Sequence, residues 1–594
     1  MADHWGASGI SRRGFLAGAS TFALVSAACS PSDGGGTAST SATPVDGLPT
    51  EAEWAALREE VGGRLINVES PLTSCTADMT SDDCSSVLEN LRNPFWIEEQ
   101  PGVSQTTGWL GAWQNQVSLY AVAAESADDI AAAVNFARDK RVRLAVKGTG
   151  HDYLGRSNAP DSLLVWTQNM REVTFHPEFR PAGADAARPP VSALSVAAGA
   201  RWLEAYQEAT ANGVYVQGGG CTSVGACGGF TLGGGFGNFS KRFGSGAGGV
   251  LEMEVVTADG QVRIVNEAQD ADLFWALRGG GGGTFGIVSR ITYLAHPIPQ
   301  TVGSLSGTIT ASGDDAFKDL LGRFVRFFPG ALIDGSWGEQ IAVKPDNSLE
   351  LSVVWLDLTT EQARAVWEPF TSELQADGLA TVDLDFESHP FRDLWNTAYW
   401  QRVAPETITL DPRPDQPSGQ FWWASNQGEV SQFIFSYLSR WLPLKMFVDT
   451  PDDLVDALFE ASRLARVSIH INKGLAGASE EVLARERTTS INPACLAAAA
   501  FATIGSQQPT AYPGIVGHEP DLTVGRKAAE QTNAAIGIIR DATPGAGTYF
   551  NEADYFEPDW QHAFWGTNYD RLLSIKRNVD PDNLFRVHNG VGSE

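Results

Sequence analysis

The chain has 594 residues, with 71 acidic and 42 basic side chains and a formal net charge of −29. This charge argues against a nucleic-acid partner, because proteins that bind the phosphate backbone concentrate Lys and Arg. The length exceeds the size at which one hydrophobic core keeps growing, so we expect at least two domains. Hydrophobic residues make up 43% of the chain, which is enough for large cores.

The N-terminal residues contain an export pattern. Arg12 and Arg13 form a twin-arginine pair, and an apolar run over 17–28 follows. That run is shorter than the about 20 residues that cross a bilayer, so it is typical of a signal peptide read by the twin-arginine export machinery. We expect the mature protein in the periplasm, at the cell surface or secreted, and no membrane-spanning helix in it.

Cys29 ends a segment that resembles a bacterial lipobox. One hypothesis is a lipid anchor at Cys29; the alternative is a cleaved signal with a cysteine that lies near the cut. We assign 1–29 to the signal, 30–48 to a flexible tether and 49–115 to an N-terminal lead segment.

The other cysteines differ in their expected states. Cys75 and Cys84 flank a short polar loop, which in an exported protein favours a disulfide. Closing that loop stabilises the fold by about 2.5 kcal/mol through chain entropy. Cys227 and Cys495 are expected to be buried, reduced thiols, and no cysteine spacing indicates a metal site.

From about residue 118, predicted strands and helices alternate. Apolar and β-branched runs predict strands over 143–147, 162–166, 214–216, 251–258, 261–265, 287–293 and 349–355. Helical periodicity and caps predict helices over 202–212, 271–277, 360–376 and 452–465. Asp259-Gly260 predicts a hairpin turn, and the chain becomes poorer in glycine after about residue 297.

Two glycine-rich loops each contain one reactive side chain. The loop 147–157 carries His151; the loop 218–229 carries Cys221 and is followed by three more glycines over 233–235. Glycine is costly inside strands and helices, and such clusters often let the backbone approach a phosphate-bearing ligand. We interpret His151 and Cys221 as the two attachment points of a covalently held flavin.

Other nucleotide and hydrolase motifs are not supported. Residues 281–286 satisfy the G-x-G-x-x-G expression, but they follow a predicted helix and precede a predicted strand, whereas a Rossmann fingerprint follows a strand and opens a helix. The sequence has no Walker P-loop, H-E-x-x-H or G-x-S-x-G motif.

Taken together, the motifs resemble those of a known family. The two glycine loops, the segment 272–282 and the closing segment 580–585 are similar, in order and spacing, to the berberine bridge enzyme-like family of the vanillyl-alcohol oxidase superfamily. Residues 146–157 and 549–558 look closest to its isoamyl alcohol oxidase-like branch, which is mostly fungal. The resemblance implies an α+β fold, with a PCMH-type FAD-binding domain of two α/β subdomains and a second α+β domain on a large antiparallel sheet.

The same resemblance implies domain limits. The FAD-binding domain would cover 116–297, the substrate-binding domain 298–545, and a C-terminal segment 546–594 would return to the FAD-binding domain.

The resemblance also implies how FAD is held. His151 would bond to the 8-methyl carbon of the flavin and Cys221 to its carbon 6. The alternatives are a hydrogen-bonded loop histidine and a buried thiol. The remaining residues expected to bind FAD are Gly148, Thr149, Gly150, Asp152, Gly155, Arg156, Ser157, Gly220, Val224, Gly225, Gly228, Gly229, Gly235, Val255 and Asn583.

The catalytic base is expected in the C-terminal segment. The family's Tyr-x-Asn-Tyr pattern reads Tyr549-Phe550-Asn551-Glu552 here. We favour Tyr549, with Glu552 and Asp554 as rivals, while the plain alternative makes Tyr549 a core residue and Asp554 a surface acid. A second open question concerns the aromatic residues that either line the pocket or only pack: Trp395, Tyr399, Trp400, Trp422 and Trp423.

The predicted function is an exported FAD enzyme that oxidises an alcohol or sugar-like hydroxyl of a small molecule by hydride transfer, with oxygen as acceptor. Phe230 and Thr231 depart from the plant members' usual residues at a position that influences oxygen access. A dehydrogenase that passes electrons to another carrier is therefore the first alternative. The second is a lipoprotein that binds solutes without redox chemistry.

Export gives the first testable prediction. Arg12→Lys combined with Arg13→Lys should leave the uncleaved precursor in the cytoplasm, because the twin-arginine pair is the recognised feature. Fractionation of cells followed by immunoblotting measures this, and unchanged export would contradict the twin-arginine interpretation.

Overall fold

The computed structural model describes residues 47–594. The predicted signal, Cys29 and nearly all of the predicted tether therefore lie outside the described residues. Within 47–594, no helix is both long and apolar enough to cross a membrane.

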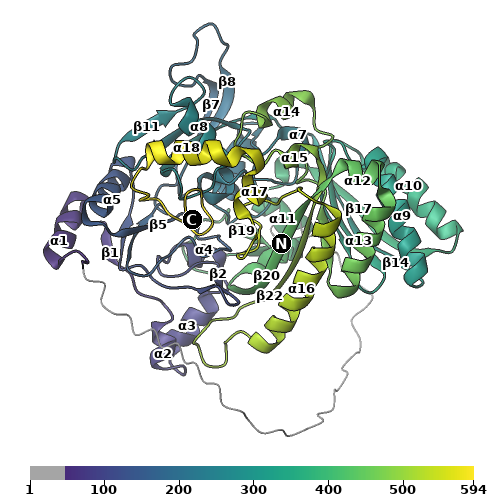
Figure 1. Ribbon diagram of the computed structural model, residues 1–594, viewed down its shortest axis with the longest axis horizontal. Helices are drawn as coiled ribbons and strands as arrows, with labels where there is room; N and C mark the ends of the chain where they lie inside the picture. The colour runs from purple at the N-terminus through teal and green to yellow at the C-terminus, as the bar shows by residue number, and fades with distance from the viewer. Residues whose placement is uncertain (1–46) are drawn as a thin grey trace.

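The N-terminal half contains two sheets side by side (Figure 1). The first has the order β1-β4-β6-β5, in which β4, β6 and β5 run parallel. The second is antiparallel, with the order β11-β10-β12-β8-β7. Their bounds are β1 Leu65–Asn67, β4 Tyr120–Ala123, β5 Arg143–Lys147, β6 Ser162–Trp166, β7 Val173–Phe179, β8 Val191–Ala197, β10 Val250–Val256, β11 Val262–Val265 and β12 Ile287–Leu294.

Helices cover these sheets with their apolar sides. Helix α5 (Ala127–Lys140) packs with α1 (Glu51–Glu60) on the first sheet, through Ile130, Val134 and Trp54. Ser126 caps α5 by accepting the Asp129 N–H. Helices α6 (Trp202–Ala211) and α8 (Ala271–Leu277) supply much of the core of the second sheet.

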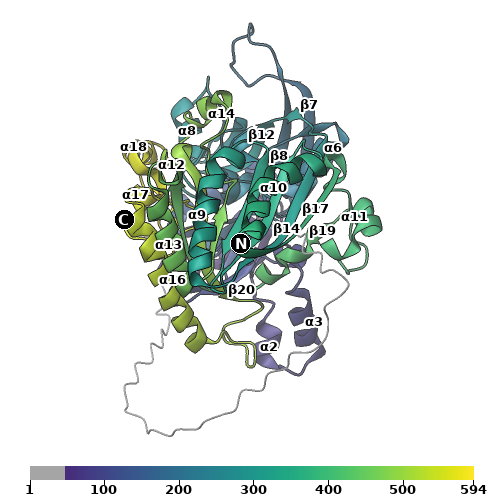
Figure 2. The ribbon, with the colours of Figure 1, turned by 90° about the vertical axis from the view of Figure 1, so that its right-hand side faces the viewer.

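A nine-stranded sheet dominates the rest of the molecule, in the order β17-β14-β16-β15-β21-β22-β20-β2-β3. Its bounds are β2 Thr106–Trp109, β3 Trp113–Gln114, β14 Thr301–Ala311, β15 Trp337–Val343, β16 Ser348–Leu356, β17 Ala380–Pro390, β20 Gln432–Pro443, β21 Val467–His470 and β22 Ala498–Gln508. Four long helices cover one face of it (Figure 2): α9 Asp314–Ala331, α10 Thr360–Ala376, α13 Pro451–Leu464 and α16 Leu522–Ala542.

The alternation of side chains along β20 decides what the other face presents. Leu438 and Leu442 join the core beneath the helices, so Tyr437, Ser439 and Trp441 point to the opposite side. That side faces the C-terminal segment, where Ser439 Oγ donates to the Glu552 carbonyl. The large sheet therefore contributes one wall of the site described below.

The remaining elements are short. Two strand pairs, β9 (Val214–Tyr215) with β13 (His296–Pro297) and β18 (Ile408–Leu410) with β19 (Phe421–Trp423), lie outside the main sheets. The other helices are α2 Thr73–Ala77, α3 Asp82–Asn90, α4 Pro94–Glu98, α7 Ser240–Phe243, α11 Thr397–Val403, α12 Leu444–Val448, α14 Glu480–Glu486, α15 Ala494–Ala497, α17 Trp560–Trp565 and α18 Tyr569–Val579.

The C-terminal segment crosses back to the N-terminal half, as Figure 1 shows for the yellow helices α17 and α18. Phe550, Trp565 and Leu572 belong to the same buried cluster as Phe274 of α8. The indole N–H of Trp565 donates to the Gly279 carbonyl at 3.0 Å. The last residues of the chain therefore help to form the same core as residues about 300 positions earlier.

Most sequence expectations for the elements are confirmed, including the mixed α+β fold. The strands over 143–147 and 162–166 and the helices over 271–277 and 360–376 have the predicted limits. The others shift by a residue or two; the strand predicted over 214–216 is only Val214–Tyr215.

One expectation about the large sheet was incomplete. It is antiparallel except where β2 pairs in parallel with β20. Strands β2 and β3 come from the predicted lead segment, so part of that segment belongs to the large sheet.

The cysteine expectations are also confirmed among the described residues. Cys75 and Cys84 form a disulfide with an S–S distance of 2.07 Å. Cys227 and Cys495 are free and buried.

Candidate active site

A cleft lies where the two glycine loops meet the C-terminal segment and strands β5 and β12. Its empty volume, open mouth included, is about 1540 Å³. Twelve of the residues predicted to bind FAD line it: Gly148, Thr149, Gly150, His151, Asp152, Arg156, Ser157, Cys221, Val224, Gly225, Gly228 and Gly229.

The two reactive side chains meet inside this cleft. Cys221 Sγ lies 3.8 Å from His151 Nε2, and both side chains line the cavity. Burial lowers the pKa of His151 to about 4, so the imidazole is neutral at neutral pH. A neutral imidazole keeps a lone pair on one ring nitrogen, which is the form that can bond to carbon.

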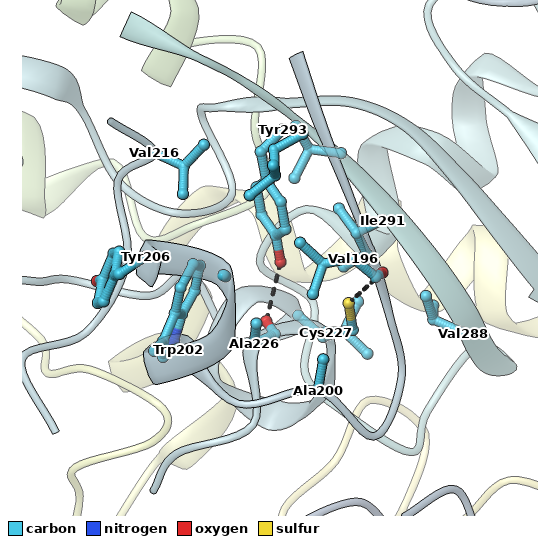
Figure 3. Close-up of a cluster of buried hydrophobic side chains, with 14 of the residues drawn as sticks. Val196, Ala200, Trp202, Tyr206, Val216, Ala226, Cys227, Val288, Ile291 and Tyr293 are labelled. Carbon is cyan, nitrogen blue, oxygen red and sulfur yellow. Dashed lines mark hydrogen bonds between the residues drawn. The ribbon is translucent and has the colours of Figure 1, made fainter. Parts of the chain in front are cut away.

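A buried cluster fixes the Cys221 loop from behind (Figure 3). The Cys227 thiol donates to the Val196 carbonyl at 2.8 Å, and the Tyr293 hydroxyl donates to the Ala226 carbonyl at 2.9 Å. Residues Ala226–Phe230 form a short π-helix in which Gly228 leaves helical geometry, with φ −87° and ψ −141°. The glycines that follow Cys227 thus form an irregular turn at the wall of the cleft.

A direct hydrogen bond joins the two loops. The Gly225 N–H donates to Thr149 Oγ1 at 3.1 Å. Because Thr149 lies two residues before His151 and Gly225 four residues after Cys221, this bond fixes the spacing of the two reactive side chains.

Tyr549 enters the cleft from the C-terminal segment. Its hydroxyl oxygen accepts the Gly235 N–H at 3.0 Å and the Asn551 side-chain N–H at 2.9 Å. The ring packs edge-on against Phe236, and Tyr549 is 5% exposed. Both lone pairs of the phenol oxygen are therefore engaged, and the neutral phenol retains only its own proton to donate.

Glu552 lines the cleft three residues later and is held by a buried ion pair. Lys473 Nζ donates to its two oxygens at 2.7 and 2.6 Å. The Tyr437 hydroxyl also reaches Glu552 Oε2, at 3.4 Å. The Lys473 side chain is fully buried, whereas that of Glu552 is 9% exposed. The carboxylate therefore lies between a buried cation and the open cleft.

Tyr153 adds a free hydroxyl to the cleft wall. Burial, followed by the charge of Glu429, raises its pKa well above the usual value. The hydroxyl is buried and has no hydrogen-bond partner among the described residues, and its ring lies 5.5 Å from that of Tyr437. Tyr153 is thus a neutral hydrogen-bond donor, close enough to Glu552 for the charge of that group to act on it.

Comparison with known proteins identifies the family. Residues 118–266 match the FAD binding domain family and residues 548–592 the "Berberine and berberine like" family. An FAD-linked oxidoreductase, ZEB1, from Gibberella zeae is 30% identical over 92% of this chain and 92% of its own length. Another, easE from Trichophyton verrucosum, is 31% identical over 92% of this chain and 89% of its own.

The chain belongs to the berberine bridge enzyme-like FAD-linked oxidoreductases.

Solved structures agree with this fold. The VAO-type flavoprotein MtVAO615 from Myceliophthora thermophila superposes with a TM-score of 0.75 at 24% identity, over 93% of this chain and 97% of its own. A glucooligosaccharide oxidase from Acremonium strictum, described with a 6-S-cysteinyl, 8α-N1-histidyl FAD, gives a TM-score of 0.61 at 18% identity, over 88% of this chain and 100% of its own.

The cleft of this oxidoreductase fits FAD on its own evidence. A Cβ added at Gly228 or Gly229 would meet no atom within 4 Å, so the backbone there lies open to a ligand. Arg156 binds Asp152 Oδ1 through Nε and Nη2, at 3.0 and 2.8 Å, while its buried Nη1 has no partner among the described residues. Exposed backbone and a free guanidinium N–H suit a dinucleotide phosphate.

Other predicted cofactor residues lie outside the cleft lining. Gly235 donates to Tyr549, and the Gly220 carbonyl accepts the Trp423 indole N–H at 3.0 Å. Val255 is fully buried in the core. The remaining two, Gly155 against the Trp113 ring and Asn583 bonded to the Gly592 carbonyl, lie close by without lining it.

Asp554 is also absent from the cleft lining. Burial raises its pKa, and its carboxylate accepts the Phe556 N–H at 3.2 Å. Neighbouring Glu557 pairs with Arg540 at 3.2 Å, yet burial raises its pKa to about 7. Glu557 therefore attaches the C-terminal segment to helix α16.

The sequence analysis did not predict one part of the cleft lining. Gly282, Gly283, Gly286 and residues 585–587 line the cleft, although the glycine run was set aside because its context rules out a Rossmann turn. Its glycine density was the available signal. The aromatic residues considered for the pocket do not line the cleft; they pack in the adjoining core: Trp395, Tyr399, Trp400, Trp422 and Trp423.

Proposed function

We propose that this oxidoreductase oxidises an alcohol or sugar-like hydroxyl of a small molecule, with FAD linked covalently through His151 and Cys221 and oxygen as the final electron acceptor. One observation carries the proposal: the two linking side chains, 3.8 Å apart, share one cleft with the Glu552 carboxylate. Export and a lipid anchor at Cys29 stay predictions from the sequence.

The double linkage is supported by chemistry and by distance. Carbon 6 and the 8-methyl group lie on the same benzenoid ring of the flavin, so the two protein atoms that bond to them have to be near neighbours. Cys221 Sγ and the His151 ring are such neighbours, with 3.8 Å between Sγ and Nε2, and the imidazole is in its neutral form. A glucooligosaccharide oxidase of the same fold is described with such a linkage.

The oxidation requires two hydrogens to leave the substrate. Bound FAD supplies the acceptor for the carbon-bound hydrogen and its two electrons. The hydroxyl proton goes to a base of the protein as the carbonyl double bond forms. This base has to line the cleft and to be unprotonated before the reaction.

We propose Glu552 as this base instead of Tyr549, which the sequence favoured. A phenol has an ordinary pKa near ~10, and both lone pairs of the Tyr549 oxygen already accept N–H groups. Glu552 is paired with a cation and opens to the cleft. Asp554 does not line the cleft, so it is the weakest of the three candidates.

Sugar-like substrates are supported by the donors and acceptors at the cleft wall. Tyr153 offers a free hydroxyl and Glu552 a carboxylate, and both suit a substrate with neighbouring hydroxyl groups. A fungal relative by fold is a xylooligosaccharide oxidase crystallised with xylobiose, at 18% identity over 85% of this chain.

A substrate screen tests the function. Purified full-length protein should consume oxygen with at least one neutral alcohol or oligosaccharide and bleach its flavin colour when oxygen is removed. An oxygen electrode and anaerobic absorbance measure the two events. Bleaching without oxygen consumption would favour the dehydrogenase alternative, and a colourless protein would contradict both enzyme hypotheses.

Acid precipitation tests the linkage. The flavin of the unmodified protein should stay with the pellet, whereas His151→Ala combined with Cys221→Ala should release it into the supernatant. Each single variant should retain flavin through the other bond. Cys227→Ala is the matched control, because that buried thiol donates to the Val196 carbonyl and is not a proposed attachment point. Free flavin from the unmodified protein would refute covalent attachment.

Rapid-mixing measurements of flavin reduction test the base. Glu552→Gln should slow reduction by about 100-fold or more, within the range that a positioned base contributes. Tyr549→Phe should have a much smaller effect, because it removes a hydrogen-bond donor and no base. The reverse pattern would assign the role to Tyr549, and two unchanged rates would show that the C-terminal segment does not supply the base.

A further inference from the structure

We propose that Lys473 is a positioning residue for the base: it pairs with both oxygens of the Glu552 carboxylate and holds it in one orientation, so that the buried Lys473–Glu552 pair works as a unit. This inference rests on the proposed role of Glu552. Lys473 follows the central strand β21 and comes from a sequence segment that none of the motifs above includes.

The position of Lys473 places its ammonium against the Glu552 carboxylate. Its side chain is fully buried, and it does not line the cleft, so it does not reach a substrate directly. Its ammonium instead donates to both oxygens of Glu552, at 2.7 and 2.6 Å. Two charge-assisted hydrogen bonds from one cation fix the plane of the carboxylate.

Other buried lysines of the chain have a different arrangement. Lys147 and Lys241 donate to backbone carbonyls, and burial lowers the pKa of each to about 7. Lys576 is shared between Asp580 and two carbonyls. These lysines tie chain segments together away from the cleft, whereas Lys473 binds a carboxylate that opens into it.

Buried carboxyl groups elsewhere in the chain show what Lys473 prevents. Burial raises the pKa of Glu486, whose oxygens accept from Ser245 but have no cation in direct contact among residues 47–594. It also raises the pKa of Glu557 to about 7, even with Arg540 at 3.2 Å. Burial therefore raises the pKa of these carboxyl groups, and a neutral acid cannot accept a proton from the substrate.

Lys473 is the positively charged group in direct contact with Glu552. From β20, Tyr437 donates a hydrogen bond. From the His151 loop, Tyr153 is a neutral phenol, and His151 itself is uncharged at neutral pH. The charge of Glu429 acts on Tyr153 and raises the pKa of that phenol. These groups are neutral or negatively charged, whereas Lys473 supplies a positive charge in direct contact.

The first arm of the test uses a substrate found in the screen. Lys473→Met should slow flavin reduction at neutral pH by about 10²-fold and move the acid limb of the pH–rate profile upward by at least one pH unit, because Glu552 then needs a higher pH to ionise. Lys473→Arg should restore most of the rate and the original limb. Lys241→Met is the matched control: it removes a buried lysine and should lower stability without moving the limb.

The second arm needs no substrate. Thermal unfolding of flavin-loaded Lys473→Met should show a loss of melting temperature that is largest at high pH and diminishes as the pH falls. The sign follows from linkage: a buried carboxyl with a raised pKa destabilises the fold fully above its folded-state pKa, and this destabilisation declines as the pH falls from that value to the unfolded-state pKa. Adding Glu552→Gln should remove that pH dependence and recover part of the loss, because no unpaired buried charge remains.

The outcomes separate the two proposals. An unmoved acid limb in Lys473→Met, or a double variant no more stable than Lys473→Met, would overturn the role of Lys473. A screen without any substrate would count against the proposed function, while the unfolding arm would still decide whether Lys473 keeps Glu552 charged. If Lys473→Met does not fold, the stability of Lys473→Arg is compared instead with that of the double variant Lys473→Met, Glu552→Gln.

Discussion

The packing of the His151 loop against the Cys221 loop is the contact on which the site depends. One hydrogen bond, from the Gly225 N–H to Thr149 Oγ1, spans the two loops. A Cβ on Gly225 would come within 3.4 Å of Thr149. Larger residues would separate the loops and with them the two side chains that we propose as flavin anchors.

The other half of the site depends on the return of the C-terminal segment. This segment places Tyr549, Asn551 and Glu552 against the two glycine loops, and the nine-stranded sheet supports it from behind through Ser439 and Lys473. Three stretches far apart in the chain thus contribute one cleft. The low effective dielectric around a buried cleft strengthens charge interactions there. An isolated buried charge is therefore costly in free energy, and a paired charge is held firmly in one position.

The charge arrangement around the cleft follows from this cost. Lysines buried away from it bind carbonyl oxygens, and burial lowers their pKa. The one behind the cleft has a carboxylate as its partner. Exposed ion pairs elsewhere, such as Arg188 with Glu267, contribute little to stability. The net charge of −29 reflects the side chains on the surface and does not indicate the chemistry of the cleft.

The sequence by itself determined the local elements, the two glycine loops, the family and the disulfide, because each rests on patterns among residues close together in the chain. Strand 143–147 and helix 271–277 have the predicted limits for that reason. Only the tertiary structure decided that β2 joins the large sheet, that Gly282 and residues 585–587 line the cleft, that Asp554 does not, and that Lys473 pairs with Glu552 across 79 residues. Such contacts depend on the packing of segments that are distant in the chain, and the type of a residue does not indicate which distant residue it contacts after folding.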